Sequence, residues 1–91
     1  MKDVCANIMV KGTVQGVGFR YFVFHRATDL GLKGFVRNNS NGTVEIEIEG
    51  DKLIIEEFMK RVKVGPKTSS VTDMKIQWKE FKHQYSTFAV R

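Results

Sequence analysis

The start of the chain changes from a period of two to helical spacing. Two sets of residues alternate first, Val4, Ala6, Ile8 and Val10 in one set and Cys5, Asn7, Met9 and Lys11 in the other. This alternation is typical of a strand with one face against a core. Apolar residues then recur at helical spacing over residues 19–30, so we expect a helix that begins near Phe19 or Arg20. Gly31 and Gly34 suit the end of that helix.

A hairpin is predicted in the middle of the chain. Residues 33–38 and 43–49 flank the sequence Asn39-Ser40-Asn41-Gly42. Because Asn and Gly tolerate positive φ, this sequence favours a tight turn between antiparallel strands. The second strand alternates two kinds of residue, which are Val44, Ile46 and Ile48 on one face and Glu45, Glu47 and Glu49 on the other.

The remaining pattern completes a fold. Asp51 suits the N-cap of a second helix, which ends at Gly65-Pro66. Residues 71–79 and 87–90 predict a fourth strand and a short fifth one. The order β, α, β, β, α, β, with a further terminal β, predicts both helices on one face of an antiparallel sheet, because each helix has one apolar stripe to bury. We expect a ferredoxin-like α/β sandwich, a single domain over residues 1–91.

The composition of the chain limits the classes of protein to which it can belong. Cys5 is the single cysteine, so a disulfide-stapled secreted scaffold is excluded and a reducing compartment is favoured. No apolar run at the start has the length of a signal peptide or a membrane span, so we expect a cytoplasmic protein with no membrane partner. The chain has 15 Lys and Arg against 10 Asp and Glu, a net charge of +5. This net charge favours the binding of anions. Because the basic residues are dispersed along the chain, the charge does not indicate whether the anion is nucleic acid, an anionic lipid or a phosphorylated metabolite.

The segment between the first strand and the first helix carries candidate chemistry, and it reads Gln15-Gly16-Val17-Gly18-Phe19-Arg20. Its glycines allow main-chain N–H groups to turn inward at a helix N-terminus, which has partial positive charge. Arg20 adds a fixed cation with paired donors that match phosphate oxygens. Glycine spacing alone also fits a tight turn with a surface arginine, so both interpretations stay open at this point.

Two longer stretches resemble the signatures of a known family. Residues 10–20 read VKGTVQGVGFR, and residues 34–44 read GFVRNNSNGTV, with Gly50 after them. They resemble, in the right order, the first and second signatures of the acylphosphatase family. The resemblance runs along essentially the whole chain, and its further matches are Gly65-Pro66, Phe88 and Val90. The family's fold agrees with the sandwich predicted above.

The resemblance implies hydrolysis of the carboxyl-phosphate bond of a small acyl phosphate, with no metal or organic cofactor. The family's phosphate-binding arginine corresponds to Arg20, and its water-orienting asparagine to Asn38, so we expect both to be catalytic. Inorganic phosphate, the product, is expected to inhibit by occupying the same site, and we expect a monomer. The family's main-chain phosphate cradle corresponds to Gln15, Gly16, Val17, Gly18 and Phe19.

The residues of these two stretches agree with that chemistry. Neither stretch contains Cys, His, Asp or Glu, or a serine paired with a base, so a covalent intermediate and a side-chain general base both lack a candidate. Water is then the nucleophile, held by the Asn38 amide, while Arg20 and the cradle stabilise charge on the phosphoryl oxygens. A carboxylate leaving group is a weak base and needs no general acid.

Other residues and functions give weaker signals. His25 and His83 are expected on the surface rather than at a metal, and Cys5 as a packed or partly exposed strand residue rather than a nucleophile. A basic ferredoxin-like domain also suits RNA binding on its open sheet face, but the glutamates of residues 45–49 are expected to line that face and repel RNA phosphates. A non-catalytic anion-sensing domain is the other alternative, although a sensor has no use for Asn38 as a water-orienting group.

Overall fold

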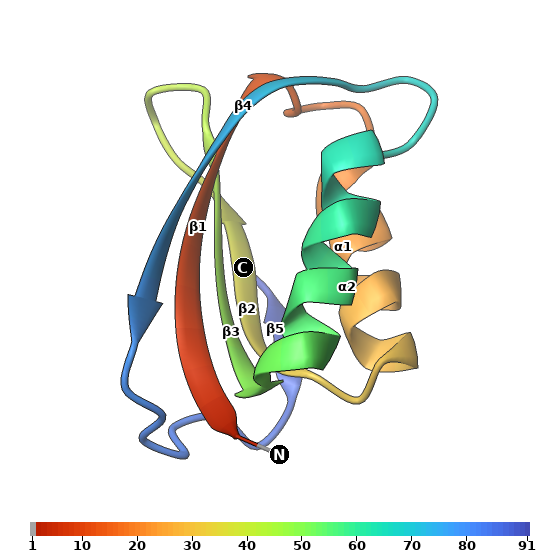
Figure 1. The fold of residues 1–91 in the computed structure, drawn as a ribbon. Coiled ribbons are helices and arrows are strands. Elements are labelled where there is room, and N and C mark those ends of the chain that lie inside the picture. Colours follow the sequence, from red (N-terminus) through yellow and green to blue (C-terminus); the bar gives the residue numbers. More distant parts are fainter. Residues whose placement is uncertain (1) are drawn as a thin grey trace.

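The computed structural model describes residues 2–91 of the 91-residue chain. The two helices lie together against one face of the sheet, as Figure 1 shows. This arrangement confirms the ferredoxin-like sandwich and the predicted order of elements. In chain order these are β1 (Asp3–Thr13), α1 (Phe19–Asp29), β2 (Lys33–Asn38), β3 (Val44–Asp51), α2 (Lys52–Val64), β4 (Ser70–Lys79) and β5 (Phe88–Val90).

The core lies between the sheet and the helices. The apolar set of β1 and the apolar set of β3 both face it, which confirms the alternation predicted for these strands. Each helix contributes a stripe of buried residues at helical spacing, and the apolar contact between the layers holds the helices on the sheet. The buried residues of the two stripes are Phe19, Val23 and Ala27 from α1 and Ile55, Phe58 and Val62 from α2.

The fifth strand corrects the expectation of an antiparallel sheet. The strand order is β4-β1-β3-β2-β5, and β5 pairs in parallel with β2, so the sheet is mixed. β4 and β5 are the two edge strands, and residues 80–87, which we call the crossing segment, connect them near the end of the sheet that lies away from the β1–α1 loop (Figure 1). Because of this crossing, β5 runs parallel to β2. That direction depends on the path of the connection, which the alternation of a short strand does not encode.

The face of the sheet away from the helices is not the open acidic surface that the sequence predicted. Glu45, Glu47 and Glu49 do point to this face, but their exposed fractions are only 9%, 7% and 3%. The crossing segment lies against two of them, since the Tyr85 hydroxyl donates to Glu47 and the Gln84 N–H donates to Glu49. The expectation of an open face was wrong because alternation assigns residues to a face without telling what covers it.

The topology brings two distant segments together. β1 and β2 are both antiparallel to β3, so they run in the same direction and finish at the same end of the sheet. The loop of residues 14–18, which follows β1, therefore lies near Asn38, the last residue of β2. Within residues 2–91, neither helix is long and apolar enough to cross a bilayer.

Candidate functional site

The β1–α1 loop presents an unfilled helix N-terminus. Gly16 and Gly18 have φ of 73° and 78°, values that a residue with a Cβ adopts only with strain. Gly18 is the N-cap of α1 and makes no side-chain capping bond. The first main-chain bond of α1 runs from the Phe22 N–H to the Gly18 oxygen, at 3.1 Å. The N–H groups of the first turn are therefore left without helical acceptors, which suits an anion.

Arg20 lies in the first turn of α1, beside this loop. Its Nη1 donates to the main-chain oxygen of Arg91, 2.8 Å away, just beyond β5. One contact leaves further guanidinium N–H groups for a ligand, because the side chain has five donors. The arginine is thus held from one side and stays available on the other.

Asn38 supplies the one buried polar side-chain atom within residues 2–91 that has no hydrogen-bond partner, its Oδ1. Leaving a buried acceptor without a donor costs about 1–3 kcal/mol. Such an atom, on a residue that ends a strand and lines a recess, is more typical of a ligand or water site than of a purely structural residue.

These groups line one recess. It has a volume of about 100 Å³. Arg20 and Asn38, predicted from separate stretches of sequence, are both part of its wall, so the structure brings them together. The full lining is Val14, Gly16, Gly18, Phe19, Arg20, Tyr21 and Asn38.

Two residues assigned to the cradle have other contacts. The Gln15 side chain donates through Nε2 to the main-chain oxygens of Asn39 and Thr43, at 2.8 and 2.9 Å. The Val17 oxygen accepts a bond from the Thr68 hydroxyl at 2.8 Å. Neither Gln15 nor Val17 is among the lining residues, so they fix the loop against the hairpin and the α2–β4 connection.

Tyr21 was missed at the site. It lines the recess, and 63% of its surface is exposed. The available signal was its position, directly after Arg20 and off the stripe of Phe19 and Val23. The contact between Arg20 and Arg91 had no local signal, because the two residues are 71 positions apart.

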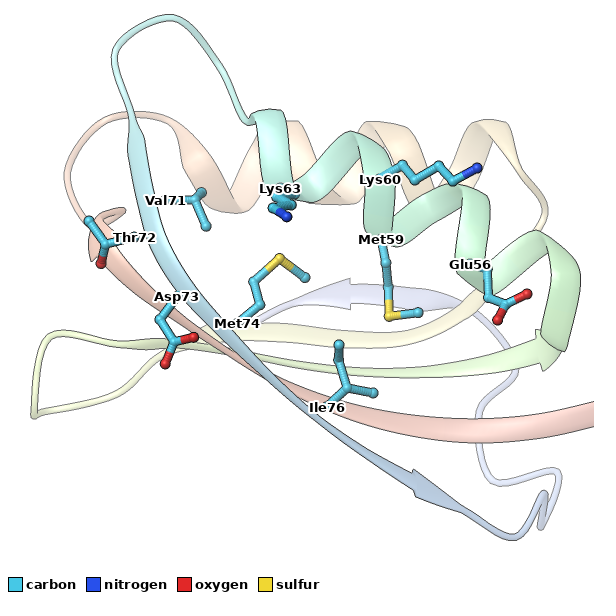
Figure 2. A pocket seen from close by; sticks show the side chains of 9 residues that line it. All are labelled: Glu56, Met59, Lys60, Lys63, Val71, Thr72, Asp73, Met74 and Ile76. Carbon is cyan, nitrogen blue, oxygen red and sulfur yellow. The ribbon is translucent and has the colours of Figure 1, made fainter.

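The larger hollow of the molecule lies elsewhere. A groove of about 660 Å³ runs between α2 and β4. Figure 2 shows Met59, Met74 and Ile76 reaching into the space between the two elements. The groove is larger, but the small recess combines a guanidinium, an open helix N-terminus and a residue with an unpartnered buried acceptor. We assign the function by this chemistry rather than by volume.

The remaining candidates agree with structural roles. His25 and His83 are exposed, as expected. Cys5 is fully buried, and burial, followed by the nearby carboxylates of Glu47 and Glu49, raises the pKa of its thiol to about 11. The thiol is therefore a poor nucleophile at neutral pH. Among residues 2–91, no three His, Cys, Asp or Glu side chains are placed to hold a metal ion.

Comparisons with known proteins all match this chain to the same kind of domain over nearly its full length. The family model described as Acylphosphatase matches residues 6–90. An acylphosphatase of Moorella thermoacetica is 45% identical over 91 residues, which are 100% of this chain and 97% of that protein. The crystal structure of acylphosphatase from Bacillus subtilis matches with a TM-score of 0.93 and 38% identity, over 97% of this chain and 98% of that one. Full-length HypF in the phosphate- and nucleotide-bound form matches with a TM-score of 0.91 and 37% identity, over 99% of this chain but only 12% of that one.

Proposed function

The chain belongs to the acylphosphatase family, and on this premise we propose that Arg20, Asn38 and the β1–α1 loop carry out the family's reaction. The activity is hydrolysis of an acid anhydride, in which an acyl phosphate gives a carboxylate and inorganic phosphate. One observation carries the assignment of roles: Asn38, whose buried Oδ1 has no hydrogen-bond partner, lines the same recess as Arg20.

The phosphate group occupies the loop. Its oxygens accept bonds from the inward N–H groups of the loop and the first turn of α1, and the partial positive charge of the helix end favours them. Arg20 adds a full charge and paired donors. Because these donors are fixed by the fold, they stabilise the charge on the phosphoryl oxygens without reorganising during the reaction.

Asn38 holds the nucleophile. Its Oδ1 accepts a hydrogen bond from a water molecule, which directs a lone pair of the water oxygen at phosphorus. The new bond forms between that oxygen and phosphorus, and the bond from phosphorus to the carboxyl oxygen breaks with its electron pair leaving on the carboxylate. One water proton passes to the phosphate product. The lining residues include no carboxylate or imidazole to take it.

A steady-state assay with acetyl phosphate and excess chelator tests this function. We expect phosphate release well above spontaneous hydrolysis, unaffected by the chelator, because Arg20 and the main-chain dipoles supply the positive charge. Activity that disappears on chelation and returns with a divalent ion would overturn the mechanism. A chain that releases no phosphate under either condition would overturn the function itself.

Inorganic phosphate is expected to inhibit competitively, because it occupies the same loop as the phosphoryl group of the substrate. Arg20→Lys keeps the charge but loses the planar pair of donors, so phosphate should inhibit this variant less. Initial rates at several phosphate concentrations measure the effect. Equal inhibition of both proteins would put the phosphate site elsewhere.

The alternative of RNA binding is weakened by the covered sheet face. RNA needs an accessible face with stacking aromatics, while here the crossing segment and the glutamates of β3 occupy it. The anion-sensing alternative predicts phosphate binding without turnover. Measuring phosphate release beside binding to single-stranded RNA at moderate salt separates all three functions.

The assembly and location are part of the same proposal. We expect a monomer, since the recess is built from one chain, and sedimentation of the protein with and without phosphate tests this. A cytoplasmic location is supported by Cys5, a free thiol in a buried position, which suits a reducing compartment. Fractionation of cells that produce the protein would check the location.

A further inference from the structure

Three glutamates are buried in a row on the back of the sheet. Glu45, Glu47 and Glu49 occupy alternate positions of β3, and all three face away from the helices. A buried carboxylate is costly unless hydrogen bonds and opposite charges surround it. The groups that partner each carboxylate therefore show which parts of the molecule the row holds together.

The first glutamate links neighbouring strands only. Glu45 pairs with Arg37 of β2 at 2.6 Å and accepts a bond from Asn7 of β1 at 2.9 Å. Both partners lie on strands that flank β3 in the sheet. This carboxylate therefore reinforces the sheet without reaching the crossing segment.

The other two glutamates bind the crossing segment. Glu47 accepts bonds from Lys79 at 3.1 Å, from Asn7 at 3.2 Å and from the Tyr85 hydroxyl. Burial alone raises the pKa of Glu47, but the bonds from Tyr85, Asn7 and Lys79 outweigh it and hold the pKa below its usual value. Glu49 accepts three main-chain N–H groups of the segment, which are those of Lys82 at 3.3 Å, Gln84 at 3.0 Å and Tyr85 at 3.3 Å.

The crossing segment leads directly to the contact that holds Arg20. After Tyr85, the Thr87 oxygen accepts the Gly34 N–H at 3.1 Å, and β5 then pairs with β2. Arg91 donates its N–H to the Val36 oxygen at 2.8 Å. The main-chain oxygen of that same residue accepts the Arg20 guanidinium at 2.8 Å.

Side-chain contacts on the face of the sheet away from the helices also link the crossing segment to Arg91. The Tyr85 ring packs edge-on against Phe35, with 6.0 Å between centroids. The guanidinium of Arg91 lies over the same Phe35 ring, 4.2 Å from its centroid. The anchored segment and the residue that holds Arg20 thus share one neighbour as well as one stretch of chain.

We propose that Glu47 and Glu49 are positioning residues for Arg20, acting through the crossing segment, β5 and Arg91. The inference rests on the proposed role of Arg20 in phosphate binding. With the segment anchored, the Arg91 oxygen is fixed and the guanidinium is presented to the phosphate in one orientation. Releasing the segment leaves the β1–α1 loop and Asn38 intact but lets Arg20 take other orientations.

Two variants test this coupling. Tyr85→Phe removes one hydrogen bond to Glu47 and keeps the aromatic ring against Phe35. Glu49→Gln removes the negative charge of the carboxylate that accepts the three main-chain N–H groups of the crossing segment. In both, we expect the inhibition constant of inorganic phosphate to rise about three- to tenfold, the size of coupling typical of contacts away from a ligand. The NMR signal of the Arg20 Nε–H should report greater mobility of the side chain, a change that a loss of stability elsewhere would not cause.

Lys79→Gln is the matched control. It removes a partner of the same Glu47 carboxylate, but from β4 rather than from the crossing segment. Phosphate inhibition and the Arg20 signal should stay unchanged in this variant, whatever its thermal midpoint. An unchanged inhibition constant in folded Tyr85→Phe, or an equal rise in Lys79→Gln, would overturn the inference. Failure of the proposed function is separate, because it appears as a wild-type protein with no turnover.

Discussion

The two helices of this protein begin in opposite ways. α2 starts after Asp51, whose carboxylate accepts the N–H groups of Leu53 at 2.9 Å and Ile54 at 3.4 Å. α1 starts after Gly18, which has no side chain to offer and whose φ of 78° turns the loop over the helix end. The N-terminus of α2 thus has two of its N–H donors satisfied by a side chain, whereas that of α1 has no side-chain cap.

In a small site with few polar side chains, an uncapped helix N-terminus indicates where an anion can bind. A capping side chain at α1 would occupy the position that we propose for the phosphate, so the glycine that weakens the helix end also leaves room for an anion. The perturbed pKa values of Cys5, Glu47 and Tyr85 lie instead on the face of the sheet away from the helices, where they mark structural bonds. Perturbed titration alone would have pointed to the wrong face.

The largest effect on activity is expected from Arg20→Ala, at the uncapped N-terminus of α1. The phosphate loses its charged partner in both the ground and transition states, so kcat/KM should fall on the order of a thousandfold and phosphate inhibition should weaken. Arg26→Ala, on the last turn of the same helix, is the control and should leave both values unchanged. An Arg20→Ala enzyme with normal phosphate inhibition would remove the arginine from the site.

Asn38→Ala is expected to separate catalysis from binding. Because we propose that the side chain contacts the attacking water rather than the phosphate, kcat should fall on the order of a hundredfold while phosphate inhibition stays nearly the same. Both values come from one set of initial rates.

Asn41→Ala is the matched control for this variant. The Oδ1 of Asn41 already accepts the Thr43 N–H at 3.1 Å and the Thr43 hydroxyl, so its loss should lower stability and leave kcat of the folded protein alone. If Asn38→Ala instead behaves like Asn41→Ala, with a lower thermal midpoint and a normal kcat, Asn38 has no part in the mechanism.

The smallest effect on activity is expected at the N-terminus of α2, which Asp51 caps. Asp51→Ala removes the cap of α2 and should cost about 1 kcal/mol of unfolding free energy, with no change in kcat or phosphate inhibition. Urea unfolding and a steady-state assay of the same sample measure both. A tenfold or greater fall in kcat of the folded protein would show that the two helix ends are not independent.

The local sequence pattern was sufficient to predict most of the fold and to select the candidate site residues that the structure brings together. Alternation located β1, β3 and β4, the turn after Asn38 located β2, and helical spacing located both helices. Arg20 and Asn38 lie at element ends that the turn residues mark. What the pattern missed depends on long-range contact: the parallel direction of β5, the cover over Glu49 and the bond from Arg20 to Arg91. Each of these is set by the path of the crossing segment, whose residues have no regular period.

We propose that a water molecule attacks phosphorus in the recess between Arg20 and Asn38. Hydrolysis of acetyl phosphate in water enriched in oxygen-18 tests it most directly, with the products analysed by mass spectrometry and spontaneous hydrolysis subtracted. We predict one labelled oxygen in the inorganic phosphate and none in the acetate, because the bond that breaks joins phosphorus to the carboxyl oxygen. Label in the acetate would place the attack at the carbonyl carbon and contradict the claim.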